Sequence, residues 1–565
     1  MMPTWKFSSP PDHQSVAALA RELNLPPFLA SFLVRTGITE PGAALRFLYP
    51  RLRDLSDPTL LPGIGEAVRA ILRAVDQGRK IVLYGDYDVD GVSSVALLTR
   101  VLRAYGVEPG RFLPHRVEEG YGLTRDGVQR CLGEHRPQLL VALDCGTSSA
   151  GQIAGLEAAG IEVVVLDHHE PQAEIPRCAA FVNPKVGSSF RYFCTVGIVF
   201  KLCHALLRER RVAGFDLKTC LDLVAVGTVA DLVPLVEENR ALVACGLRQL
   251  ECTRWLGLQA LKQVAAITSP IRPGHVGFRL APRLNAAGRV GAALDALNLL
   301  LCDDRVEAAA LARCLDVQNR ERQKLEEETL RQALEQALVD GDPGERAAIV
   351  VGARGWHPGV VGIVASRLMR KFHRPALVIG FGEDGVGKGS GRSIAGFSLV
   401  KALDQCAEHL AAYGGHEMAA GLSLPHDALD GFRARFLAVA QTALEIDQLR
   451  PVLEVTAPVD GCDLVDEVWQ AHELLQPFGI GNPQPLLCLP GVSPVDEPRI
   501  LKDKHRLLRL RHRGRVLRAV YFNGAAAILP APPWDVAFYL ETNEYQGRVE
   551  PQVQVEAIRR AGPWT

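Results

Sequence analysis

The sequence has no excess of charge of either sign, since 63 Lys and Arg stand against 64 Asp and Glu. The formal net charge of −1 therefore gives no indication of nucleic-acid binding, and any basic surface has to be local. No run of about 18 or more uninterrupted apolar residues occurs, so we expect no membrane span. The first residues, MMPTWKFSSPPDHQ, lack the apolar segment of a signal peptide, and we expect none.

A cysteine pattern is absent as well. The 13 cysteines include no CxxC pair and no Cys/His spacing typical of zinc. An odd number of scattered cysteines is typical of reduced thiols, and we therefore expect a cytoplasmic protein.

The chain is long enough for two to four domains. Between about residues 79 and 235, apolar runs alternate with helical patterns. The runs KIVLYGDYDVDG, QLLVALDCG and IEVVVLDHH begin as strands rich in Val, Ile and Leu. Such runs between helices predict a parallel sheet covered on both faces, in an α/β domain of the doubly wound type.

The rest of the chain divides into three further segments. Residues 303–342 contain no Pro and no Gly before Gly341 and are rich in helix formers, which predicts a long connecting helix with a polar middle. A second, smaller α/β unit follows, with strands at RAAIVVGA, RPALVIGFG and EMAAGLSLP. Short alternating strands after residue 450 predict a small β-barrel or sandwich. The predicted limits of the four segments are 1–302, 303–342, 343–448 and 449–565.

Acidic residues follow three predicted strands of the first domain. In an open parallel sheet, ligands bind beyond the carboxyl ends of the strands, so these side chains should meet at one edge. A further candidate, Asp231, stands in the otherwise apolar GTVADLVPL, where a lone carboxylate is costly without a partner. The residues that follow the strands are Asp86, Asp88 and Asp90, then Asp144, and finally Asp167, His168 and His169.

Each of these features has a simpler explanation when taken alone. Asp144 fits a helix cap or a turn, Asp231 fits a hydrogen-bonded buried carboxylate, and the adjacent histidines fit a surface turn. The DxDxDG spacing also resembles a calcium loop, but Leu97 stands where that loop needs a Glu. The coincidence of four such features in one sheet favours a shared site.

Clustered carboxylates repel one another unless cations neutralise them. Oxygen ligands with one or two imidazoles suit Mn²⁺ or Mg²⁺. The surplus of carboxylates suits two ions about 3.5–4 Å apart, an arrangement for in-line attack on phosphorus. Asp144 is the natural candidate to bridge the two ions.

The segments DYDVDG, LDCG, LDHHE and GTVADLVPL resemble, in order and spacing, the four motifs of the DHH phosphoesterases. PRLNAAGRV, GWHPGVVGIVASRL, GKGSGRSI, GGHEMAAG and GIGNPQP are similar to the single-strand-specific DNA exonucleases of that family, so the resemblance covers nearly the whole chain. It implies a DHH domain, a DHH-associated domain and an OB-fold. The implied activity is metal-dependent 5′→3′ exonuclease action on single-stranded DNA, releasing mononucleotides in recombination and repair.

The resemblance also implies partners and metal ligands. We expect a nucleoid-associated monomer whose partners are a single-strand-binding protein and a helicase. The implied ligands of two divalent ions are Asp88, Asp90, Asp144, His168 and Asp231. Asp86, Asp167 and His169 either join them, orient them or contact the phosphate. We favour His168 as a ligand and His169 facing the scissile phosphate, and we expect Asp144, Asp167 and both histidines to be catalytic.

The Gly-rich GVGKGSGRSI is expected to be a turn that brings N–H groups and Arg392 to a phosphate, with a structural hairpin as the alternative. A Walker A loop is excluded because Gly389 replaces the required Ser or Thr and no helix opens there. By the resemblance, the segments that face the metal site and hold the nucleotide contain Ser390, Arg392, Gly414, Gly415 and His416.

Other substrate candidates have structural alternatives. PRLNAAGR places Arg283, Asn285 and Arg289 close together, either for phosphate contact or as a salt-bridged helix start. Trp356, beside the candidate His357, fits a core position as well as a stacking platform.

A local basic segment occupies residues 499–518, with nine Lys and Arg against one Asp. Because LRLRHR alternates, Arg509, Arg511 and Arg513 should share one face of a strand. That face is either simply solvated or, as the resemblance to an OB-fold implies, a groove for single-stranded DNA.

Two other functions remain open. A DHH phosphodiesterase for short oligonucleotides or cyclic dinucleotides would not need the basic C-terminal segment. An inactive DHH relative acting as a DNA-binding scaffold would have lost metal carboxylates, whereas every motif Asp and His is present.

Overall fold

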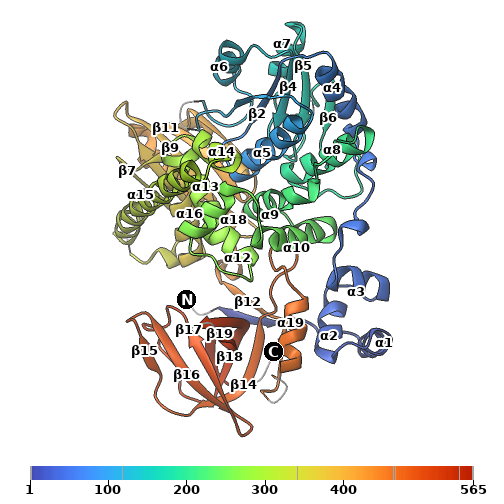
Figure 1. The fold of residues 1–565 in the computed structure, drawn as a ribbon. Coiled ribbons are helices and arrows are strands. Elements are labelled where there is room, and N and C mark those ends of the chain that lie inside the picture. Colours follow the sequence, from blue (N-terminus) through green and yellow to red (C-terminus); the bar gives the residue numbers. More distant parts are fainter. Residues whose placement is uncertain are drawn as a thin grey trace. The chain divides into compact units, whose positions relative to one another are not determined.

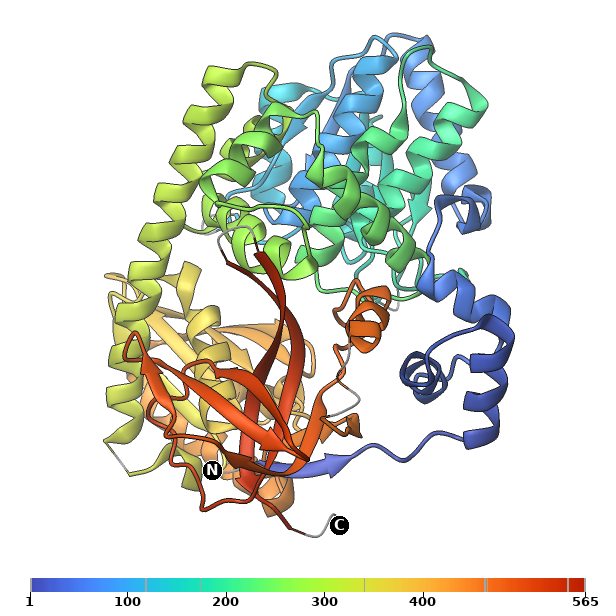
Figure 2. The same cartoon turned by 60° about the horizontal axis from the view of Figure 1, so that its bottom comes forward.

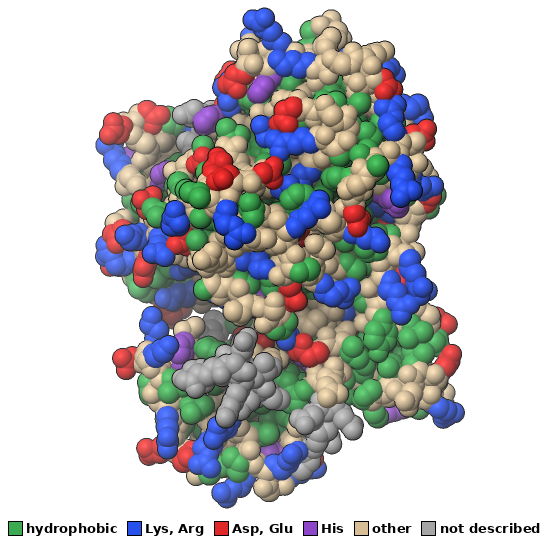
Figure 3. Space-filling model, viewed as in Figure 1, with side chains coloured by type: hydrophobic (Ala, Val, Ile, Leu, Met, Phe, Trp, Pro, Cys, Tyr) green, Lys and Arg blue, Asp and Glu red, His purple; other side chains and the backbone are tan. Residues whose placement is uncertain are grey.

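The computed structural model describes residues 3–116, 119–172, 174–339, 341–461, 464, 466–545 and 548–562 (Figure 1). The chain forms two compact units. The first contains Ser56–Val233 and Cys245–Pro451, and the second contains the described residues up to Leu55, Pro234–Ala244 and those from Val452 onward. Among the described residues, no helix is both long enough and apolar enough to span a membrane. Basic and acidic side chains are interspersed on the face seen in Figure 3, in keeping with the small net charge.

A parallel five-stranded sheet forms the core of the first unit, which confirms the predicted fold class. Its order is β3–β2–β4–β5–β6. Every residue of β2 and β4 is buried, which explains their uninterrupted apolar sequences. The strands are β2 (Ile81–Gly85), β3 (Gly110–Phe112), β4 (Leu139–Leu143), β5 (Glu162–Leu166) and β6 (Ala180–Val182).

Helices cover both faces of this sheet. On one face, Val128 of α6 (Arg125–His135) and Ile153 of α7 (Ala150–Ala158) join the core beneath Val82 and Tyr84. On the other face, α5 (Val89–Ala104) lies so close to Gly85 that a Cβ there would be 2.4 Å from Val95. Since β2 lies between β3 and β4, the strand order reverses at β2, and a crevice is expected at the carboxyl ends of β2 and β4.

Helices continue the unit and lead to the predicted connecting helix. α15 has 34 residues and is roughly 50 Å long. Its polar middle is less exposed than the sequence suggested, because Arg322 and Glu326 are buried and form an ion pair of 2.6 Å. The helices before and including it are α8 (Thr195–Glu209), α9 (Leu221–Ala230), α10 (Glu237–Glu251), α11 (Leu256–Val264), the π-helix η4 (Val276–Leu280), α13 (Ala281–Val290), α14 (Ala293–Leu301) and α15 (Arg305–Leu338).

A mixed five-stranded sheet follows, in the order β10–β11–β9–β8–β7, with only β7 and β8 parallel. Its hydrophobic core includes Leu377, Ile379, Leu422 and Phe432. The elements are β7 (Ile349–Arg354), α16 (Pro358–Phe372), β8 (Ala376–Phe381), β9 (Val386–Arg392), β10 (Ala412–Gly415), β11 (Ala419–Pro425) and α18 (Leu429–Ala443).

The prediction of a Gly-rich turn is wrong and the alternative of a structural hairpin is confirmed, because VGKGSGR is the central strand β9, which follows β8 and pairs with it antiparallel. A Cβ on Gly387, Gly389 or Gly391 would lie 2.5 Å, 2.8 Å or 2.5 Å from Phe381, Ile379 or Leu377, so these glycines let the strand pack closely on the core. Lys388, Ser390 and Arg392 alternate with the glycines and therefore point to the opposite face.

The second unit contains an OB-type barrel, which confirms the prediction for the C-terminal segment. The strand order is β13–β14–β18–β19–β17–β16–β15, and an additional pairing between β14 and β16 closes the barrel. The long strands β18 and β19 run side by side (Figure 2). The strands are β13 (Ala457–Pro458), β14 (Leu487–Pro494), β15 (Arg499–Leu501), β16 (His505–His512), β17 (Arg515–Tyr521), β18 (Trp534–Tyr545) and β19 (Arg548–Arg560).

The described residues up to Leu55 group with this barrel, which differs from the predicted limits of 1–302. The strand β1 (Thr4–Phe7) pairs in parallel with β12 (Val452–Val455). Leu29 and Leu33 of α2 (Pro27–Arg35) pack with Ala471 of α19 (Asp466–Leu474). These pairings join segments from opposite ends of the chain, and no local sequence pattern predicts them.

Candidate active site

The acidic residues meet at the carboxyl ends of β2, β4 and β5, as predicted from the sheet rule. Asp86 to Asp90 follow β2, and the Asp88 carboxylate caps α5 by accepting hydrogen bonds from the N–H groups of Asp90 and Gly91. Asp144 follows β4, and Asp231 ends α9. Three groups of ligand atoms lie within 4.8 Å of one another: Asp144 with His168 and His169, Asp90 with His168 and Asp231, and Asp86 with Asp88 and Asp144.

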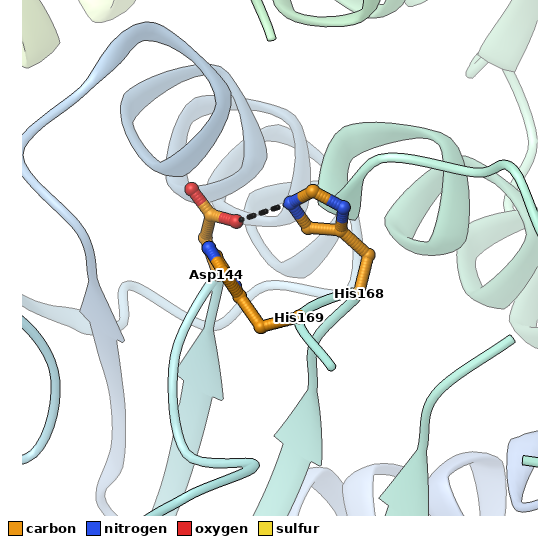
Figure 4. A group of neighbouring side chains, drawn as sticks. All are labelled: Asp144, His168 and His169. Atoms are coloured by element: carbon orange, nitrogen blue, oxygen red, sulfur yellow. Dashed lines mark ion pairs between the residues drawn. The ribbon is translucent and has the colours of Figure 1, made fainter. Parts of the chain in front are cut away.

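The imidazole of His168 is common to two of these groups. Its Nε2 lies 3.4 Å from Asp144 Oδ1, 3.5 Å from Asp231 Oδ2 and 4.0 Å from Asp90 Oδ2. Figure 4 shows the ring turned toward the Asp144 carboxylate. The geometry therefore favours His168 over its neighbour as the histidine of the carboxylate cluster.

The N-terminus of α8 orients two of the carboxylates. Asp90 accepts hydrogen bonds from the backbone N–H groups of Thr195 (2.6 Å) and Val196 (2.8 Å). The Thr195 hydroxyl donates to Asp144 Oδ1 at 2.9 Å. A Cβ on Gly227 would stand 2.7 Å from Val196 and 3.2 Å from Asp90 Oδ1, so only glycine leaves this contact undisturbed.

Burial and mutual repulsion raise the pKa values of the clustered carboxylates. Burial, followed by the charge of Asp88, raises the pKa of Asp90 to about 7. Burial, followed by the charge of Asp90, raises the pKa of Asp231 to about 9, and the same causes raise the pKa of Asp144 well above its usual range. Burial lowers the pKa of His168 to about 3, so its imidazole is neutral and able to act as a ligand.

Asp167 and His169 form a separate pair beside the cluster. Asp167 Oδ2 accepts from the Thr147 N–H, and Oδ1 accepts from the His168 and His169 N–H groups. Asp167 Oδ1 also lies 2.7 Å from Nδ1 of His169. Burial opposes ionisation of Asp167, but the hydrogen bond and charge of His169 and the hydrogen bonds from Thr147 together outweigh it and hold the pKa of Asp167 below its usual range. Both Asp167 oxygens are thus engaged, Oδ1 with the loop after β5 and Oδ2 with the loop after β4, which suits a residue that orients His169.

The donor set fits hard divalent cations. Five carboxylates and one neutral imidazole are the ligands that Mn²⁺ and Mg²⁺ prefer. Within the described part of the chain, the buried atoms Asp86 Oδ1, His168 Nε2 and Asp231 Oδ2 make no hydrogen bond. Buried polar atoms without partners are costly, and metal coordination would remove that cost.

A cavity of about 1050 Å³ opens beside this cluster. Tyr87, between two of the clustered carboxylates, and Leu232, next to Asp231, both line it. Its wall also contains Glu326 and many basic side chains, namely Arg116, Arg289, Arg322, Arg367, Arg370, Lys388 and Arg392. Several of these have partners within the protein. Arg289 donates to the Gly359 carbonyl and Arg392 donates to Ser390 Oγ, while Arg322 and Arg367 both pair with Glu326. Burial lowers the pKa of Arg289 to about 10, so this guanidinium stays charged near neutral pH.

Comparisons with known proteins agree with this architecture. Family models match residues 80–228 (DHH family, N-terminal domain), 345–442 (DHHA1 domain) and 455–557 (RecJ OB domain). The single-stranded-DNA-specific exonuclease RecJ of Bacillus subtilis is 36% identical over 561 residues, which cover 98% of this chain and 70% of that protein. The chain belongs to the RecJ family.

Two solved RecJ structures from Thermus thermophilus show the same fold. The complex with Mn²⁺ matches with a TM-score of 0.86 and 33% identity, covering 99% of this chain and 80% of that one. The complex with Mg²⁺ matches with a TM-score of 0.80 and 32% identity, covering 99% and 79%. The fold similarity to RecJ therefore extends over nearly the full length of this chain.

Within this RecJ-family fold, some of the predicted substrate residues line the cavity and others lie elsewhere. Arg289, Ser390, Arg392 and Gly414 line the cavity. Gly415 ends the exposed strand β10, and His416 follows it as an exposed residue. Asn285 is half-buried on α13.

Three further predicted residues occupy structural positions. Arg283 forms an ion pair of 2.9 Å with Asp316, which is the salt-bridge alternative. Trp356 is 5% exposed in the core and donates its indole N–H to Gln332 Oε1, so the stacking platform is wrong. His357 caps α16 by accepting from the Gly359 N–H.

The alternating basic strand is confirmed only in part. Arg509 and Arg511 are exposed on β16, while Leu508, Leu510 and His512 face inward. Arg513 lies beyond the strand, with φ of 44° in the turn before β17, and it forms an ion pair with Asp460. The prediction of a shared face is therefore wrong for Arg513. Its place is taken by Arg518, which lies directly opposite Arg509 on β17.

Several polar residues that position the site were not predicted from the sequence. They are Tyr121, Thr147, Asn183 and Thr195, each in a loop or at a helix start. None belongs to a periodic pattern.

Proposed function

We propose that this chain is a metal-dependent exonuclease that degrades single-stranded DNA from the 5′ end and releases mononucleotides. The main supporting observation is the carboxylate–histidine cluster beside a cation-lined cavity, in a chain of the RecJ family. The cellular setting we propose is recombination and repair at the nucleoid in the cytoplasm. The proposed enzyme acts as a monomer, assisted by a single-strand-binding protein and a helicase.

The residues that would hold two Mn²⁺ or Mg²⁺ ions are Asp86, Asp88, Asp90, Asp144, His168 and Asp231. Two such ions would lower the pKa of a water molecule and neutralise charge on the phosphate oxygens. Asp144, whose carboxylate belongs to two of the ligand groups, is our candidate for the bridging residue. The chain orients the ligands through the N–H groups and hydroxyl at the start of α8. In this mechanism His169, held by Asp167, faces the scissile phosphate.

The cavity suits a single-stranded nucleotide chain. Arg289, Ser390 and Arg392 offer donors for backbone phosphates. Leu232 and Phe278 also line the cavity and are 65% and 83% exposed. The aromatic ring of Phe278 offers a face on which an unpaired base can stack, and Leu232 offers apolar contact in the same cavity, whereas bases in a duplex are already stacked.

The proposed activity is tested with single-stranded DNA labelled at either end, in the presence of Mn²⁺. We expect the 5′ label to be released first as a mononucleotide, while the 3′ label stays on a shortening strand. Early release of the 3′ label would contradict the polarity. Activity confined to dinucleotides or cyclic dinucleotides would support the phosphodiesterase alternative, and binding without cleavage would support a scaffold.

The raised carboxyl pKa values predict that the metal-free protein loses stability as pH rises. Because the folded state holds the protons of Asp90 (pKa about 7) and Asp231 (pKa about 9) more tightly than the unfolded chain does, the protons stabilise the fold at low pH. This stabilisation is fully present below about pH 4 and is lost progressively up to about pH 9. Melting with EDTA should therefore give a lower Tm at pH 8 than at pH 6, and Mn²⁺ should remove most of the difference.

Asp231→Asn is the matched variant for this measurement. Asn cannot ionise, so the variant should show a smaller fall of Tm with pH in EDTA than the wild type. Parallel curves with EDTA and Mn²⁺ would contradict the assignment of these carboxylates to a metal site.

The exposed basic face of the barrel predicts salt-dependent binding of single-stranded DNA. Arg509 lies directly opposite Arg518 and pairs with Asp496 at 2.8 Å, so the two like charges are only partly compensated within the barrel and would be relieved further by a phosphate backbone. We expect Arg509→Glu/Arg511→Glu to weaken binding at least about 10-fold and to reduce the slope of log K against log salt.

Fluorescence anisotropy across a salt series measures both quantities. The matched control is Arg21→Glu/Arg46→Glu, an equal charge change at exposed positions on helices of the same unit. Equal losses in the two double variants would show that only net charge matters.

A further inference from the structure

Tyr121 is a residue of the site to which the proposed chemistry gives no role. It lies in the loop between β3 and α6, and its hydroxyl reaches two groups that the chain supplies from separate strands. The oxygen lies 3.0 Å from the backbone carbonyl of Asp144, to which it donates. It also lies 2.9 Å from Nδ1 and 3.2 Å from Nε2 of His169.

The backbone of Asp144 needs such a contact. Asp144 has φ of 65°, in the left-handed region that non-glycine residues rarely adopt. Its N–H donates to the Leu166 carbonyl at 3.0 Å, and its carbonyl accepts from Tyr121. The hydroxyl thus completes the backbone hydrogen bonding of a residue whose carboxylate lies at the centre of the cluster, at a position where strain is typical of functional sites.

His169 is held by three contacts, two at its ring and one at its backbone carbonyl. Asp167 Oδ1 contacts Nδ1 at 2.7 Å, and Asn183 Nδ2 donates to the His169 carbonyl at 2.9 Å. Tyr121 supplies the third contact. A phenol has a single hydrogen. When it is donated to the Asp144 carbonyl and Nδ1–H of His169 is donated to Asp167, the phenol oxygen is left to accept from Nε2–H of His169, 3.2 Å away.

We propose that Tyr121 is a positioning residue of the reaction, whose hydroxyl fixes the His169 imidazole relative to the backbone of Asp144. This inference rests on the proposed function, because it gives His169 and Asp144 their roles at the phosphate. Without the hydroxyl, the His169 imidazole keeps its hydrogen bond to Asp167 but is no longer held in a fixed position relative to the carboxylate cluster.

Tyr121→Phe isolates the hydroxyl because it keeps the ring, which packs against His169 with centroids 5.2 Å apart. We expect kcat on single-stranded DNA to fall about 10- to 100-fold, the usual effect of losing an orienting partner. KM and the calorimetric affinity for Mn²⁺ should change by less than about 3-fold. The matched control is Tyr105→Phe, whose hydroxyl donates to the Arg210 carbonyl at 2.7 Å. That control should keep wild-type kcat.

A double-mutant cycle separates positioning from general stability. If Tyr121 acts through His169, adding Tyr121→Phe to His169→Ala should lower kcat by less than about 3-fold further. The proposal is overturned if the two losses multiply, if Tyr121→Phe keeps wild-type kcat, or if kcat, KM and Mn²⁺ affinity all fall together.

A metal-free measurement keeps this test independent of activity. In EDTA, the ring ¹⁵N signals of His169 should shift in Tyr121→Phe and stay unchanged in Tyr105→Phe. Unchanged signals in Tyr121→Phe would overturn the proposal even in an active enzyme. A wild type that does not degrade single-stranded DNA would instead refute the proposed function, and the ¹⁵N result would still decide whether the hydroxyl orients His169.

Discussion

Asp144→Asn should lower kcat on single-stranded DNA by about 10³-fold or more while leaving the fold intact. Removing the carboxylate proposed to bridge two metal ions costs several kcal/mol of transition-state stabilisation, and about 4 kcal/mol corresponds to 10³-fold. Asn has nearly the same shape and can still accept the hydrogen bond from the Thr195 hydroxyl. Because Asn has no charge to share with Asp90 and Asp231, the metal-free variant should melt at the same or a higher temperature than the wild type.

The control for this variant is Asp222→Asn. Asp222 is also fully buried and accepts a hydrogen bond of 2.6 Å from the Thr253 hydroxyl, but it lies at the start of α9 rather than in the cluster. Its activity should stay within about 3-fold of the wild type. Activity of Asp144→Asn above one tenth of the wild-type value would contradict the two-metal mechanism.

Arg392→Gln should lower kcat/KM for single-stranded DNA about 100-fold. Arg392 is partly buried on the cavity face of β9, where water screens its charge little. Removing one partner of a buried, hydrogen-bonded charge pair costs about 2–5 kcal/mol, so a loss of about 100-fold lies at the lower end. Steady-state kinetics with an oligonucleotide measures the ratio.

Arg433→Gln is the matched control in the same sheet domain. Arg433, on α18, also donates to a backbone carbonyl, that of Val350, and pairs with Asp430. Its loss should affect stability more than kcat/KM. An equal loss in both variants would show that Arg392 acts through the fold and not through the phosphate.

The parallel sheet and the acidic edge could be predicted because both follow from short-range patterns. The strands β2, β4 and β5 have five residues each and, apart from Glu162 at the start of β5, lack charged residues, and a general rule places their carboxyl ends at one edge. Asp144 and His168 could therefore be brought together before any coordinates were known. The choice between His168 and His169 could only be a preference, because it depends on which ring turns toward the carboxylates.

Other parts of the structure depend on contacts between distant segments. The sequence GVGKGSGR left a phosphate-binding turn and a structural hairpin open, since glycine has low strand propensity and the close approach of Leu377 and Ile379 decides the outcome. Whether Trp356 stacks on DNA or lies in the core depends on Gln332, on a helix 24 residues earlier. No role could be predicted for the hydroxyl of Tyr121, because its hydrogen-bond partners follow two different strands.

The alternation within β9 links the stability of the hydrophobic core to the position of the side chains that line the cavity, two properties that are usually independent. Gly387, Gly389 and Gly391 form one side of the strand against the hydrophobic core, and Lys388, Ser390 and Arg392 form the other side against the cavity. A methyl group added on the core side would displace the strand and move all three polar side chains with it. Substitutions of these glycines that add apolar contacts to the core would therefore also change how the protein binds single-stranded DNA. An engineer seeking a more heat-resistant variant should leave β9 unchanged.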